Sequence, residues 1–183
     1  MRLSSPRVTL VSGAEQAGEA KARNAPAMPL RVPHRLTIIG MGAEEEALRE
    51  RARSLGIQDR VAFVPFLPRQ ELWQRLPKLD ALVFTTSGSE ALGLVAVEAQ
   101  AHGLPLVYSN VAGMAETLGQ AGIPFTAGDP ASLASALDQL TRDVHRRKYL
   151  IRAGLVNSLL YDMTHTARQV ANLTTKIVSA APA

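Results

Sequence analysis

The chain has 183 residues, of which 46% are hydrophobic and only 4% aromatic, a composition that suits one domain with an aliphatic core. It contains no cysteine, which excludes a disulfide framework and a cysteine metal site. The formal net charge is +4, but basic and acidic residues are interspersed, so the charge alone is weak support for nucleic-acid binding.

No apolar run approaches the roughly 20 residues that a membrane-spanning helix needs. Residues 1–13 lack the apolar stretch of a signal peptide, and we therefore expect a soluble, cytoplasmic protein. The densest basic run, residues 142–152, is interpreted as the solvated face of a helix. A peripheral contact with an anionic membrane surface is the alternative interpretation of this run.

Short β-branched or aliphatic runs alternate with amphipathic segments along the whole chain. Strands are predicted over residues 7–11, 36–39, 61–64, 81–84, 105–109 and 123–125. Helices are predicted over residues 14–23, 43–55, 70–76, 93–102, 113–118, 129–142, 144–160 and 163–178. Pro124 favours an edge position for the last strand, and Asp129 followed by Pro130 is typical of a helix start.

This alternation predicts an α/β fold, a Rossmann-like parallel sheet of about six strands with helices on both faces. We divide the chain into residues 1–34, a first strand and a connection of uncertain structure; residues 35–162, the Rossmann-like domain; and residues 163–183, a C-terminal helix and tail. Ligands of such sheets bind outside the carboxyl ends of the strands. The loops expected there lie at residues 12–13, 40–42, 66–68, 85–92 and 109–113.

Residues 85–110 are the most informative segment, because two glutamates, Glu90 and Glu98, flank the apolar run 91–97. On a helix that starts near Gly93, the two side chains would lie about 80° apart around the axis and about 12 Å apart along it. The free N–H groups at the helix start would favour an anion between them. A nucleotide-sugar has this layout: ribose hydroxyls, a diphosphate and sugar hydroxyls. The alternative is structural, with Glu90 a helix-entry residue and Glu98 a core-edge glutamate paired with an arginine.

The same segment, SEALGLVAVEAQAHGLPLVYSNVAGMAE, resembles the E-x7-E signature of the retaining, GT-B-type glycosyltransferases of family 4. The matching positions are Glu90, Gly93, Leu94, Glu98, Ala99, Gly103, Leu104 and Pro105. Gly113 and Glu116 match the Gly-Gly-x-x-Glu turn of that family in part, with Ala112 in place of the first glycine. The resemblance extends over about residues 35–178 and concerns the nucleotide-binding C-terminal half of the family's fold.

The resemblance implies the donor-binding domain of a retaining hexosyltransferase that uses a nucleotide diphosphate sugar. It implies that Glu98 accepts hydrogen bonds from the ribose hydroxyls and that Glu90, the catalytic candidate, lies beside the donor sugar. The other residues expected to bind the nucleotide-sugar are Ser89, Ala91, Leu92, Gly93, Leu94, Phe66 and Leu67. No cofactor and no metal are expected, because there is no Asp-x-Asp motif and the four histidines lack metal-ligand spacing. His102 is interpreted as a partner of the helix C-terminus.

Two features depart from the family pattern. The acceptor-binding N-terminal domain is missing from this chain. The family also carries an Arg and a Lys after the first strand, which clamp the diphosphate, whereas this chain has Ser12-Gly13-Ala14-Glu15-Gln16 and no lysine before Lys21. The alternative function is therefore an inactive homologue, or a subunit that needs a partner chain to supply the acceptor domain; nucleic-acid binding ranks last.

Overall fold

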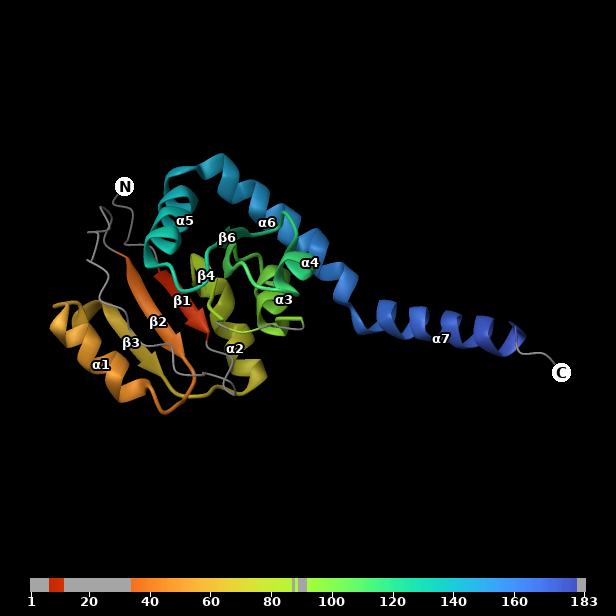
Figure 1. The fold of residues 1–183 in the computed structure, drawn as a ribbon, viewed down its shortest axis with the longest axis horizontal. Helices are drawn as coiled ribbons and strands as arrows, with labels where there is room; N and C mark the ends of the chain where they lie inside the picture. Colours follow the sequence, from red (N-terminus) through yellow and green to blue (C-terminus); the bar gives the residue numbers. More distant parts are fainter. Residues whose placement is uncertain (1–6, 12–33, 87, 89–91, 181–183) are drawn as a thin grey trace.

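The computed structural model describes residues 7–11, 34–86, 88 and 92–180 (Figure 1). The strands are β1 (Arg7–Val11), β2 (Arg35–Ile39), β3 (Val61–Val64), β4 (Ala81–Phe84), β5 (Leu106–Ser109) and β6 (Ile123–Phe125). The α-helices are α1 (Glu45–Ser54), α2 (Arg69–Arg75), α3 (Leu94–Ala101), α4 (Met114–Leu118), α5 (Pro130–Arg142), α6 (Val144–Ser158) and α7 (Met163–Ala180). Short 3-10 turns cover Gln58–Arg60, Leu76–Lys78 and Leu159–Tyr161.

The strands form one six-stranded sheet in the order β3-β2-β1-β4-β5-β6, and every pairing in it is parallel. The predicted parallel sheet is therefore confirmed, and β6 with its Pro124 lies at an edge, as expected for a residue without an N–H group. The first strand lies in the interior of the sheet, where Leu10 is in register with Ile38 of β2 and Val83 of β4.

Helices cover both faces of the sheet, and the alternation of side chains along β4 shows how. Leu82 and Phe84 point into a core with residues of α2, α3 and α4, whereas Ala81 and Val83 point into a second core with residues of α5 and α6. All four residues of β4 are buried, as in a central parallel strand. The first core is the one that positions the candidate site.

Several predicted helix boundaries move by one or two residues. The helix predicted to start at Gly93 starts at Leu94, because Gly93 adopts the left-handed conformation (φ 62°) and acts as the N-cap. Asp129 caps α5 as predicted, accepting hydrogen bonds from the N–H groups of Ala131 and Ser132. The helix predicted over residues 14–23 lies outside the described residues.

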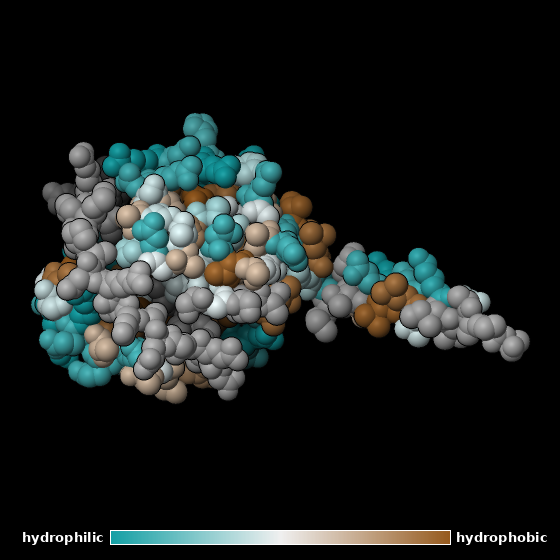
Figure 2. All heavy atoms as spheres, viewed as in Figure 1, coloured by the Kyte–Doolittle hydropathy of each residue, from teal (hydrophilic) through white to brown (hydrophobic). Residues whose placement is uncertain are grey.

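The last helix, α7, projects away from the body of the molecule (Figure 1). The side chains described on it are exposed, Val170 and Leu173 among them. Figure 2 shows apolar atoms on this projecting helix and on the adjoining end of the body. Within the described part of the chain, no helix is long and apolar enough to cross a membrane.

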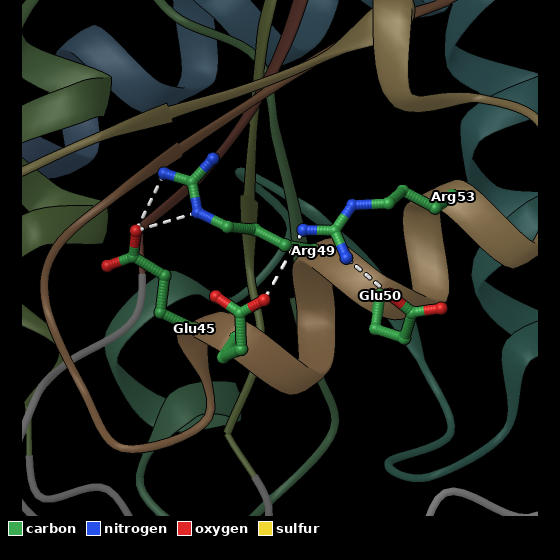
Figure 3. Close-up of polar contacts among 5 residues, drawn as sticks. Glu45, Arg49, Glu50 and Arg53 are labelled. Carbon is green, nitrogen blue, oxygen red and sulfur yellow. Dashed lines mark hydrogen bonds and ion pairs between the residues drawn. The ribbon is translucent and has the colours of Figure 1, made fainter.

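The acidic and basic residues of α1 pair with one another on its surface (Figure 3). Arg49 forms an ion pair with Glu45 at 2.7 Å, and Arg53 contacts both Glu46 and Glu50. Such exposed pairs contribute little stability, but they balance the charge of the helix. Two of the three arginines of α1 are thus paired with acidic residues of the same helix.

Candidate functional site

The candidate site is centred on Glu98, a carboxylate in the second turn of α3. This helix is apolar on several sides: Ala96, Val97 and Ala99 are buried. The Glu98 side chain remains 17% exposed, so it lies at the edge of the core with a route to solvent. A carboxylate in this position is stable only when other groups compensate its charge.

Two residues of α2 supply that compensation. The Arg69 Nη2 atom lies 2.9 Å from Glu98 Oε1, and the indole Nε1–H of Trp73 donates a hydrogen bond to Glu98 Oε2 at 3.2 Å. The structural alternative for Glu98, pairing with an arginine, therefore describes the contact that the structure shows. It does not exclude a ligand, because Arg69 is itself 63% exposed.

Trp73 is held between side chains from two helices. The Arg69 guanidinium lies 5.6 Å from the centroid of the Trp73 ring, and the His102 ring lies 5.8 Å away with a tilt of 40°. The His102 Nδ1 atom lies 2.7 Å from the Glu98 backbone carbonyl oxygen, within hydrogen-bonding distance, so His102 sits at the C-terminus of α3 as predicted. These contacts join α2 and α3 around the carboxylate.

The loop between β3 and α2 carries two of the predicted binding residues, and the structure gives them different surroundings. Phe66 is 69% exposed, whereas Leu67 packs against the first core. The phenyl ring is thus accessible to a ligand, while the Leu67 side chain has a packing role. Two residues after Leu67, α2 begins with Arg69, which forms the ion pair with Glu98.

The predicted phosphate-binding segment is described only in part, since Ser89, Glu90 and Ala91 lie outside the described residues. Leu92 is half-buried, Gly93 is buried and Leu94 is 53% exposed. The first turn of α3 therefore reaches the surface at its N-terminus, where the backbone N–H groups of an α-helix lack partners within the helix.

A buried serine ties together the ends of the two strands that flank this segment. Ser109, at the end of β5, accepts a hydrogen bond at 2.9 Å from the N–H group of Thr86, two residues after the end of β4. Its side chain is only 1% exposed, so the contact is sheltered from water. It sets where the loop that leads to Glu90 leaves the sheet.

The site as described offers hydrogen-bond acceptors and an exposed aromatic ring rather than metal ligands. Among the described residues, no three His, Asp or Glu side chains gather into a group that could hold a metal ion. A carboxylate at the edge of the core can accept hydrogen bonds from hydroxyl groups, and a helix N-terminus can bind an anion. Arg69 and Trp73 were not among the residues predicted from the sequence. The available signal was that both lie in the first turns after the predicted 66–68 loop.

Comparison with known proteins places this chain in a family. The family Glycosyl transferases group 1 matches residues 3–155. The D-inositol 3-phosphate glycosyltransferase of Frankia alni is 38% identical over 136 residues, which are 72% of this chain and 33% of that protein. This chain thus spans about a third of the length of that relative.

Two solved structures share the fold. Sucrose-phosphate synthase from Thermosynechococcus elongatus superposes with a TM-score of 0.75 and 22% identity, over 97% of this chain and 46% of that one. The Anabaena protein HepE, solved in complex with UDP-glucose, gives a TM-score of 0.71 and 22% identity, over 78% of this chain and 41% of that one. The chain belongs to the glycosyl transferases group 1 family and has the fold of the C-terminal half of its GT-B members.

Proposed function

We propose that this chain binds the donor of a retaining glycosyltransferase, which moves a hexose from a nucleotide diphosphate sugar to an acceptor. The observation that carries the proposal is Glu98, a carboxylate at the core edge that is oriented by two partners and still open to solvent. It occupies the second glutamate position of the family's signature. The UDP-glucose bound to HepE, a protein of the same fold, supports this class of ligand.

The proposed arrangement follows the path of the chain across the carboxyl end of the sheet. Glu98 accepts hydrogen bonds from the ribose hydroxyls, and Phe66 offers its exposed ring to the base. The N–H groups at the start of α3, from residues 91–94, face the phosphates together with Ser89. Glu90 lies beside the donor sugar, where positive charge develops at the anomeric carbon as its bond to the diphosphate breaks.

The sequence after β1 departs from the family pattern. This favours a second candidate function, a domain that binds the nucleotide-sugar without transferring the sugar. The arginine and lysine that clamp the diphosphate in the family are not found directly after Val11 in this sequence. Two charge-assisted hydrogen bonds to phosphate are among the strongest contacts such a site can make. We therefore propose that donor binding by this domain is weak.

The test is calorimetric titration of UDP, ADP and GDP into the 183-residue chain and into Glu98→Ala. A hydrogen bond to a charged acceptor contributes roughly 1.5–3 kcal/mol, so the substitution should weaken nucleotide binding by about one to two powers of ten. Glu90→Gln is the matched control, because it removes the charge of the other glutamate. A nucleoside diphosphate carries no donor sugar, so its affinity for Glu90→Gln should be close to its affinity for the unchanged protein.

Equal affinity of the unchanged protein and a folded Glu98→Ala variant would contradict the ribose contact. Binding of none of the three diphosphates would contradict the proposed function as a whole.

A further inference from the structure

Glu98 receives one hydrogen-bond donor on each of its two oxygens. Arg69 lies on Oε1 at 2.9 Å and Trp73 on Oε2 at 3.2 Å. An ionised carboxylate offers about four lone-pair positions, two on each oxygen. Each oxygen of Glu98 therefore keeps capacity to accept one further hydrogen bond.

The remaining lone pairs of Glu98 suit hydrogen bonds from a pair of neighbouring hydroxyl groups. Two oxygens on one carboxyl carbon can each accept one hydrogen bond from a vicinal diol such as that of ribose. The 17% exposure of the Glu98 side chain shows that solvent, and hence a ligand, reaches the carboxylate. A freely rotating glutamate would have to be ordered on binding, at a cost in side-chain entropy.

We propose that Arg69 and Trp73 are positioning residues, which hold the Glu98 carboxylate in the orientation that accepts a ribose diol. This inference rests on the proposed function. Neither residue is given a direct contact with the ligand: both act through Glu98. The two contacts on Glu98 persist when the nucleotide binds, because they use lone pairs that the diol does not need.

The packing around Trp73 orients its indole ring so that the N–H group donates to Glu98. The ring is contacted by the Arg69 guanidinium and the His102 ring, which come from its own helix and from α3. Leu72, the residue before it, is buried in the first core and anchors α2 there. The indole is therefore restrained by Arg69, by His102 and by its own hydrogen bond to Glu98, although it is 39% exposed.

The experiment separates an effect on ribose from a general effect on folding. Each nucleoside diphosphate of the panel, UDP, ADP and GDP, is titrated beside its 2′,3′-dideoxy form. The quantity measured is the affinity for the ribose form divided by the affinity for the dideoxy form. This ratio isolates the contribution of the hydroxyl groups. The variants are Trp73→Phe, which deletes the N–H group but keeps an aromatic ring, and Arg69→Met, which removes the guanidinium but keeps the stem.

We expect the ratio of ribose-form affinity to dideoxy-form affinity to be about three- to tenfold lower in each variant than in the unchanged chain. This is the effect expected from losing one orienting hydrogen bond. Affinity for the dideoxy form should change little. Arg69→Lys should restore part of the ratio because it returns a positive donor. Arg75→Met, at the exposed far end of the same helix, is the matched control and should leave the ratio unchanged.

Two results would overturn the inference while leaving the proposed function in place. A ratio that stays unchanged in both variants would mean that Arg69 and Trp73 only stabilise the fold. A higher affinity of the variants for the ribose forms would mean that Arg69 and Trp73 block the Glu98 carboxylate and must be displaced by the nucleotide. If instead the unchanged chain binds the ribose and dideoxy forms equally, the ribose contact of the proposed function fails, and the inference fails with it.

A second measurement needs no substitution at Trp73. Because the chain has a single tryptophan, its indole N–H gives one resonance in a proton–nitrogen correlation spectrum. This resonance should move in Glu98→Ala, and in the unchanged chain it should respond more strongly to the ribose nucleotide than to its dideoxy form. A resonance that is indifferent to Glu98→Ala would contradict the contact itself.

Discussion

His34 lies just before β2, and its surroundings oppose protonation of the ring. Partial burial lowers the pKa of His34 below its ordinary value of 6.5; Asp138 raises the pKa in opposition, and Arg60 lowers it further. Among the described residues, no group forms a hydrogen bond with its Nδ1 atom. The folded protein therefore favours the neutral imidazole, whereas the unfolded chain takes up a proton near the ordinary value.

The sign of the resulting pH effect follows from proton linkage. As pH falls through about 6.5, the unfolded state binds a proton that the folded state refuses, so stability decreases. We expect the free energy of unfolding of the unchanged chain to fall more between pH 7.5 and 5.5 than that of His34→Gln. Urea unfolding at both pH values measures this. His145→Gln, at an exposed position of α6, is the control, and equal losses in the protein and His34→Gln would contradict the prediction.

At the scale of secondary-structure elements, α3 is held from two sides. On one side are the α2 contacts of Glu98; on the other is a buried amide network with α6. Gln100 is fully buried, donates to the Ala121 carbonyl oxygen at 3.1 Å and accepts from Asn157 Nδ2 at 2.8 Å. Asn157 also donates to the carbonyl oxygen of Thr117 in α4, so α6 is tied to α4 as well. Buried polar groups of this kind favour one packing because every partner is needed.

Gly154 on α6 permits this close approach. A Cβ atom added there would lie 3.1 Å from Gln100 Cγ and 3.2 Å from its Cβ. Gln100 cannot easily give way, because both ends of its amide are engaged. Overpacking costs about 1–3 kcal/mol, and the better helix propensity of alanine returns only about 1 kcal/mol. We expect Gly154→Ala to destabilise the protein by up to about 2 kcal/mol in urea unfolding.

The control for this prediction is Arg152→Ala, which substitutes an exposed residue of the same helix and should change stability by less than about 0.5 kcal/mol. A Gly154→Ala variant as stable as the unchanged chain would mean that α3 and α6 separate more readily than their contacts indicate.

At the scale of the whole molecule, the chain presents one half of a two-part fold. It covers 33% of the Frankia relative and 46% of the sucrose-phosphate synthase chain. The described side chains of α7 are exposed, and the helix extends beyond the body (Figure 1). Transfer needs donor and acceptor held together, and such positioning can supply several kcal/mol of barrier reduction.

We therefore expect the 183-residue chain alone to bind a nucleoside diphosphate and to transfer no sugar. The measurement is an assay with UDP-, ADP- and GDP-glucose and a simple acceptor, followed by product detection over many hours. A Glu98→Ala sample and a protein-free sample are the controls. Steady product formation that depends on the unchanged chain would show that a complete active site exists within these residues.

Local sequence patterns were sufficient for most of the helices and strands. The strands at residues 7–11, 61–64, 81–84 and 123–125 were predicted with their observed bounds, because short aliphatic runs and turn residues act within a few positions. The edge position of β6 followed from Pro124, and the start of α5 from Asp129. These features depend on backbone chemistry that neighbouring residues determine.

Only the tertiary structure decided which partners Glu98 has. Arg69 and Trp73 are 29 and 25 positions away in the chain. Nothing local to Glu98 selects Arg69 among the 20 lysines and arginines, or indicates that the single tryptophan contacts it. The packing of α2 and α3 on one face of the sheet brings them together, since Leu72 and Ala99 share the first core. The structure also gives Phe66 and Leu67 different surroundings: Leu67 packs against that core, whereas Phe66 faces solvent.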